Sequence, residues 1–208
     1  MKKCCLWYLL ILLLCFGVFV GLAEEAVRYT SGDYKYILLE DGTAEIVDYT
    51  GSETELTVPA LLDDHPVTGI GERAFAEYIE LKAVVLPDGL LRIGKEAFSG
   101  CSALVEMVLP DSVTILDDKA FANCAELRSI NFPNRVSVGS LVLVSCHSDL
   151  VVTIDNRFDQ SVIDSENPEE REKLLMKEAS KNDRWCQKME RWCDKNMIQY
   201  VYPEQVTE

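Results

Sequence analysis

The sequence predicts an α+β fold built around a short β-solenoid of repeated coils, with a β-hairpin before the coils and a capping helix after them. Three observations predict it: an internal period of about 23 residues, a strand-like pattern within each copy, and an amphipathic stripe near the C-terminus. They divide the chain into four parts. These are an export signal or membrane anchor (1–23), a hairpin and lead-in segment (24–66), the repeats (67–154), and an acidic linker with a helix (155–208).

The first 23 residues have the features of an export signal. Lys2 and Lys3 precede an uninterrupted apolar run, and Gly21-Leu22-Ala23 places small residues where a signal peptidase reads. The run approaches the roughly 20 residues that span a bilayer, so an uncleaved anchor is the alternative. A lipid anchor at Cys15 is disfavoured, because the apolar run continues beyond it. Either way the rest of the chain is exported, which predicts a secreted or cell-surface protein.

A β-hairpin is predicted in the lead-in segment. The stretch "LLEDGTAEIVDYTG" places Asp41-Gly42 between two arms rich in apolar residues, which is a hairpin signal. After it, "ELTVP" matches the strand end of a repeat whose front half is missing.

The repeats are recognised by residues that recur in phase. In three copies the same columns hold alanine, phenylalanine, leucine and proline: Ala74, Ala97, Ala120; Phe75, Phe98, Phe121; Leu81, Leu104, Leu127; Pro87, Pro110, Pro133. In the pattern L-x-x-V-x-L-P, the apolar positions share one side of an extended segment and the proline ends the strand. The Ala-Phe pair predicts a tight helical turn, with the phenylalanine filling the interior. A degraded fourth copy follows, in which Cys146 falls one residue early and Leu150 returns to phase.

These segments resemble a known family. A 23-residue period lies in the range of leucine-rich repeats, and "LLRIGKEAFSGCSALVEMVLP" and "VTILDDKAFANCAELRSINFP" are similar to the BspA-like leucine-rich-repeat family. The lead-in and the closing "WCDKNMIQYVYP" also look like those of such arrays. The chain departs in being short and in placing Asp117 where a glycine is usual. The resemblance implies an exported or surface protein, and some members are implicated in adhesion to host matrix proteins or to other cells.

A helix is predicted after the linker. Asn167-Pro168 supplies a cap and a proline at the first helical position. A single stripe then holds Leu175, Ala179, Cys186, Met189, Cys193 and Met197, with Trp185 and Trp192 beside it. We expect this stripe to cover the open end of the solenoid, which would otherwise expose its core. The alternative is a helix that binds a partner or a membrane surface, and mixed charges argue against the membrane.

No catalytic, metal or cofactor site is predicted. The two histidines, His65 and His147, lie in a turn and beside Cys146, and no recognised catalytic motif is present. The chain has no C-x-x-C pair, and its aspartate pairs lack the spacing of a calcium loop. Cys101 and Cys124 share a column and should be buried reduced thiols, since parallel side chains disfavour a disulfide.

The outward strand positions are the candidate binding residues: Ala83, Val85, Glu106, Val108, Ser129 and Asn131. The net charge of −15 argues against nucleic acid, and a membrane is expected as a partner only through an uncleaved N-terminal segment. Four or five strands give a face of roughly 400 Å² against about 800 Å² per partner in a standard interface, so binding should be weak or multivalent.

The sequence therefore predicts an exported, non-enzymatic protein that binds an extracellular or host matrix protein, or a surface glycan, at low affinity. The alternatives are a structural or assembly component of the cell envelope, held by its N-terminal segment, and an accessory domain that assists an exported enzyme.

Overall fold

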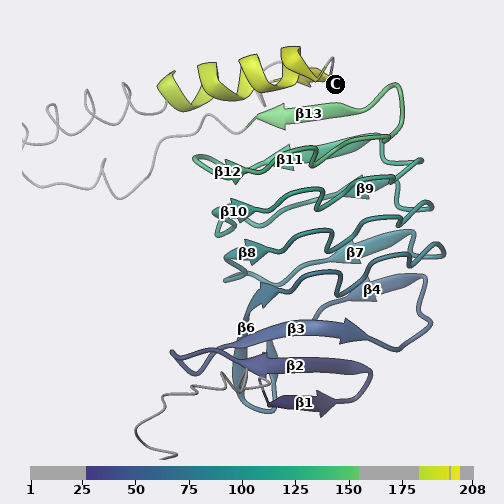
Figure 1. The fold of residues 1–208 in the computed structure, drawn as a ribbon, viewed down its shortest axis with the longest axis vertical. Helices are drawn as coiled ribbons and strands as arrows, with labels where there is room; N and C mark the ends of the chain where they lie inside the picture. The colour runs from purple at the N-terminus through teal and green to yellow at the C-terminus, as the bar shows by residue number, and fades with distance from the viewer. Residues whose placement is uncertain (1–26, 155–182, 197, 202–208) are drawn as a thin grey trace, which may run out of the picture.

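A computed structural model describes residues 27–154, 183–196 and 198–201 of the chain. They form a stack of coils with a small antiparallel meander at one end and a helix at the other (Figure 1). Outside the described residues lie the predicted export signal, the linker, the predicted helix start at Asn167 and the stripe residues Leu175, Ala179 and Met197.

The N-terminal meander contains the predicted hairpin. Its strands are β1 (Arg28–Ser31), β2 (Tyr34–Leu38) and β3 (Ala44–Tyr49), paired in that order. In the β2–β3 turn, Asp41 accepts hydrogen bonds from the backbone N–H of Thr43 at 3.0 Å and from its hydroxyl at 2.7 Å. Gly42 takes φ +81°, a left-handed conformation that glycine adopts without strain. The hairpin is therefore closed by the two residues that predicted it.

One side of the solenoid is a ladder that begins on the meander. From β3 it runs through β6 (His65–Ile70), β8 (Arg92–Ile93), β10 (Ile115–Leu116) and β12 (Ser137–Val138), all in parallel, with β5 (Leu61–Leu62) antiparallel to β6. The meander thus gives the first coil a hydrogen-bonded neighbour.

A second side carries the strands of the L-x-x-V-x-L-P pattern and one strand from beyond the repeats. They are β4 (Glu55–Thr57), β7 (Ala83–Val85), β9 (Glu106–Met107), β11 (Ser129–Phe132), β13 (Val151–Ile154) and β14 (Gln199–Val201). They pair in parallel as β4–β7 and as β9–β11–β13–β14, and Val105 N–H bridges the two groups by donating to Lys82 C=O at 3.4 Å. Ser129 pairs with Glu106, 23 residues earlier, whereas it pairs with Val151 only 22 later. The shorter step belongs to the degraded copy.

The Ala-Phe segment forms the third side and differs from the helical turn predicted for it. Phe75 N–H donates to Ala97 C=O at 2.9 Å, and Phe98 N–H donates to Ala120 C=O at 2.8 Å. Just before each alanine, the chain turns through a left-handed residue: Arg73, Glu96 and Lys119. The intervening N–H groups close tight turns within each coil, as when Ala76 N–H donates to Arg73 C=O at 3.0 Å, so the segment combines these turns with a third ladder between coils.

The phenylalanines stand in single file inside the coils. Ring centroids of Phe75 and Phe98 lie 5.1 Å apart, and those of Phe98 and Phe121 lie 5.4 Å apart, with interplanar angles of 4° and 6°. Tyr49 of the meander starts the file, 5.5 Å from Phe75. Leu143 is the buried apolar residue of the corresponding segment in the fourth copy. The predicted continuous core is confirmed.

The glycine before the Ala-Phe segment is required by close approach of the coils. A Cβ at Gly94 would lie 2.8 Å from Ile70 C=O and 2.9 Å from the backbone of Gly71. Asp117 occupies this column one coil later, and its carboxylate accepts two hydrogen bonds from Arg92. The Asp117 N–H still donates to Ile93 C=O, at 2.9 Å, whereas the Gly94 N–H donates to Ile70 C=O at 2.7 Å. The hydrogen bond between coils is therefore longer where the column holds a side chain.

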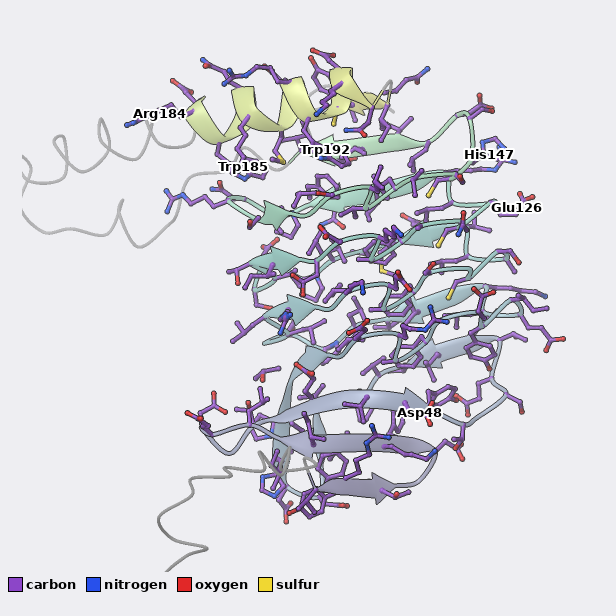
Figure 2. All side chains as sticks on the ribbon, viewed as in Figure 1. Asp48, Glu126, His147, Arg184, Trp185 and Trp192 are labelled. Carbon is purple, nitrogen blue, oxygen red and sulfur yellow. The ribbon has the colours of Figure 1, made fainter. Side chains whose placement is uncertain are left out.

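The C-terminal helix covers the last coil. Residues 183–195 are helical, and Trp185, Met189 and Cys193 are buried on the side that faces the solenoid. The indole N–H of Trp185 donates to Val136 C=O at 3.0 Å, and Trp192 packs against Phe132 at 5.7 Å. Figure 2 shows both tryptophans directed from the helix toward the coils. The predicted cap is confirmed.

No helix within the described ranges has the length and apolar content needed to span a bilayer.

Candidate binding face

The outward side of the strands from β4 to β14 is a regular surface, and we call it the strand face. Along each strand the side chains alternate between the core and this face, as in the pattern exposed-buried-exposed of β7. Rigid backbone pairing fixes the spacing of the outward residues, so the face presents them as a preformed array.

The structure brings all six predicted residues onto the strand face. Ala83 and Val85 come from β7, Glu106 from β9 and Val108 from the position just after it. Val85 and Val108 are each 61% exposed, which is high for large apolar side chains in regular backbone. Their exposure makes the centre of the face apolar.

Ser129 and Asn131 are less available than the other four. Both are half-buried on β11. The Asn131 side-chain oxygen accepts from Leu109 N–H at 2.6 Å, and its amide nitrogen donates to Leu109 C=O at 2.8 Å. Asn131 therefore extends the ladder beyond the end of β9 and has less hydrogen-bonding capacity left for a ligand.

Sequence reasoning missed further residues of the face. Val105, just before β9, is 46% exposed and lies in the ladder between Lys82 and Arg128, at the edge of the strand face. The end strands add outward residues that the repeat pattern did not assign: Glu55, Thr57, Val151, Thr153, Gln199 and Val201. The alternation within "ELTVP" and "VVTI" could have indicated them, whereas β14 follows a segment with no repeat pattern.

The histidines serve local structure. His65 Nδ1 lies 2.8 Å from Gly42 C=O, which ties β6 to the hairpin turn. His147 Nδ1 accepts from Asp149 N–H at 3.0 Å within its own loop. Among the described residues, no cluster of three histidine, cysteine, aspartate or glutamate side chains could hold a metal ion.

Three cysteines form a column beside the phenylalanines. The thiols of Cys101, Cys124 and Cys146 donate to the carbonyls of Phe75, Phe98 and Phe121 at 3.2, 3.3 and 3.2 Å. Burial raises the pKa of Cys101 to about 12 and that of Cys146 to about 11, and it also raises the pKa of Cys124. All are free thiols, as predicted for Cys101 and Cys124, and they act as small apolar residues with a weak donor.

Comparisons with known proteins agree with this architecture. The family model described as the BspA type leucine rich repeat region matches residues 45–161, in six copies. A leucine-rich repeat protein from Bacteroides capillosus ATCC 29799 is 30% identical, with a TM-score of 0.50, over 58% of this chain and 96% of that one. The T. pallidum leucine rich repeat protein is 24% identical, with a TM-score of 0.52, over 62% and 71% of the two chains. No curated protein matches the sequence.

Proposed function

Because the chain belongs to the BspA-type leucine-rich-repeat family, we propose that it is an exported, non-enzymatic protein that binds another macromolecule through its strand face. Proteins of this family are often found on cell surfaces or secreted, and they are generally binding proteins without enzymatic activity. The proposed partner is an extracellular or host matrix protein, or a surface glycan, bound at low affinity.

The exposed valines on β7 and on either side of β9 are the observation that carries this proposal. Val85, Val105 and Val108 remain exposed on a surface whose backbone is held rigidly by neighbouring strands. Apolar side chains at the centre of a surface and polar ones around it are the usual anatomy of a binding site. Here Lys82 and Arg128 neighbour Val105 in the ladder and Glu106 is exposed on β9, so charges of both signs lie beside the valines.

The size of the face sets the affinity. Six strands at ~4.8 Å spacing, each with about three residues at ~3.3 Å, span roughly 300 Å². Since a standard interface buries about 800 Å² per partner, one copy should bind weakly. Presentation of several copies on one surface would raise the avidity without any new contact.

A binding screen with matched variants tests the proposal. The protein would be displayed as multimers against matrix proteins and glycans, together with Val85→Glu/Val108→Glu. The control is Leu91→Glu/Ile115→Glu, which changes exposed apolar residues on the opposite ladder. We expect the strand-face variant to lose at least ten-fold in avidity and the control to bind like the parent. Equal binding by both variants, or no partner at high avidity, would reject the proposal.

Mapping the mature N-terminus tests export. Cleavage after Ala23 would leave Glu24 as the first residue and release the protein from the membrane. An intact N-terminus in the membrane fraction would favour the alternative, a structural or assembly component of the cell envelope.

A further inference from the structure

The C-terminal helix carries a basic stripe on the side away from the coils. Arg184, Lys188, Arg191 and Lys195 follow one another at intervals of four, three and four residues, and all four are exposed. At about 100° per residue this spacing places them within roughly 60° of arc. The buried residues of the helix lie on the opposite side, so the stripe faces away from the repeats.

Most of these cations have no carboxylate partner. Across the part of the chain that the structure describes, Lys188, Arg191 and Lys195 take part in no ion pair, and Arg191 Nε donates to the backbone oxygen of Gln187 at 3.0 Å. The repeats differ in this respect. There Arg73 pairs with Glu96 at 2.6 Å, and Lys95 pairs with Glu72 at 3.1 Å. Among the described residues, Lys188, Arg191 and Lys195 therefore keep their positive charge available to an outside partner.

The opposite end of the molecule is strongly acidic. Residues 27–66 contain nine aspartates and glutamates but only two basic residues, Arg28 and Lys35, and Lys35 is already paired with Asp48 at 2.7 Å. The turn that holds Asp63 and Asp64 lies beside the edge strand β1, because Asp63 accepts a hydrogen bond from Ser31 Oγ at 2.8 Å.

This acidic end is also built like a contact surface. Among the described strands, β1 pairs only with β2, so its outer edge keeps backbone groups available. Val27 and Tyr29 are exposed there, at 67% and 39%. Figure 1 places this end and the helix at the two ends of the stack.

We propose that the basic stripe of one copy binds the acidic N-terminal end of a second copy, head to tail. Each molecule carries both surfaces at opposite ends, so the contact is heterologous and can extend into a chain of copies. The proposal does not depend on strand-face binding. A chain of copies would nevertheless present many strand faces in a row, which supplies the multivalency that weak binding requires.

A second copy fits the stripe better than a linear polyanion does. Asp183, Glu190 and Asp194 lie along one flank of the stripe, and the whole chain has a net charge of −15. A long polyanion would have to pass these carboxylates, whereas a compact acidic end can meet the stripe alone. The stripe is about 17 Å long, so the contact is small and its attraction should fall steeply with salt.

Sedimentation velocity of the purified protein, combined with charge reversal, tests the proposal. One variant reverses the charge of the stripe on the helix with Lys188→Glu, Arg191→Glu and Lys195→Glu. The other variant reverses the charge of the acidic N-terminal end with Asp33→Lys, Glu40→Lys and Asp64→Lys. Asp63 is left unchanged because its carboxylate also accepts a hydrogen bond from Tyr36. Position 64 has a left-handed backbone (φ +67°), which lysine can adopt, since Lys119 has φ +56° in this chain.

We expect the parent to self-associate at about 0.05 M salt and to dissociate at about 0.5 M, where screening confines charge interactions to a few ångströms. Each variant alone should associate at least ten-fold more weakly. An equimolar mixture of the two variants should restore association, because the acidic helix of one variant then meets the basic N-terminal end of the other. Circular dichroism would verify that both variants remain folded.

Two results would overturn the proposal. One is a parent that stays monomeric at low salt, and the other is a mixture that fails to restore association between folded variants. Binding of the monomeric parent to polyphosphate, abolished by the helix reversal, would assign the stripe to a polyanion instead.

Discussion

At the residue scale, Asn131 shows how a side chain on the strand face can also support the fold. Its amide satisfies both backbone groups of Leu109. We expect Asn131→Ala to lower the free energy of unfolding by about 1–2 kcal/mol, because two backbone groups lose their partner in a half-buried site. Urea denaturation measures the change, with Ser129→Ala as the neighbouring control. Equal stability of Asn131→Ala and the parent would contradict this role.

The thiol column has its own consequence at this scale. Buried thiols with raised pKa values should resist alkylation, and half-buried Cys146 should react before Cys101 and Cys124. We expect peptide mapping after treatment with iodoacetamide at pH 8 to show this order. Rapid labelling of Cys101 in the folded protein would refute it.

The same thiols predict how stability depends on pH. Their stabilising effect is fully present below the usual thiol pKa of 9.0 and is lost as the pH rises toward about 12, the pKa of folded Cys101. The free energy of unfolding should therefore fall with increasing pH above 9. This fall should be shallower in Cys101→Ala, which lacks one of the titrating thiols. An identical slope in parent and variant would show that other groups cause it.

Residue-scale features were predicted from the sequence only where they recur. The phenylalanine, cysteine and leucine columns repeat every 23 residues, so their burial followed from the period. The bonds of Asn131 and the pairing of Arg92 with Asp117 depend on side chains that occur once. A period carries no information about such contacts.

At the scale of elements, Trp185 joins the helix to the ladder. Its indole N–H donates to Val136 C=O, the last coil's counterpart of Val113. We expect Trp185→Phe to cost about 1–2 kcal/mol of stability, because a buried carbonyl loses its donor. Trp192→Phe keeps an aromatic ring beside Phe132 and removes no indole hydrogen bond found among the described residues, so it serves as the control. Thermal denaturation of the two variants would compare them, and equal midpoints would argue against a specific role for the indole N–H.

The sequence predicted the elements unevenly for a physical reason. The hairpin, the strands and the cap each have a local signal: a turn dipeptide, alternation or an amphipathic stripe. The Ala-Phe segment was predicted as a helical turn because an apolar pair is compatible with either backbone. Bonds between coils decide the conformation there, and Glu96 and Lys119 accept left-handed geometry to allow them.

At the scale of the whole molecule, the six predicted residues lie on one face, and exposed Val105, which the sequence did not single out, lies at its edge. The period fixed which strand positions point outward, and the register of Glu106 with Ser129 follows it. Val105 was missed because it lies before the strand, where the pattern gives no orientation. The face also includes β14, which joins the sheet only through tertiary pairing with β13.

The central claim is that successive coils share one core and fold as one unit. Native-state hydrogen exchange at the amides of Phe75, Phe98 and Phe121 tests it most directly, since each donates to the next coil. We predict one common free energy of exchange for all three amides. Phe98→Ala should lower it by about 3–5 kcal/mol at Phe75 and Phe121 alike, because the cavity weakens a shared core. A change confined to the coil of Phe98, with Phe75 and Phe121 unaffected, would contradict the account.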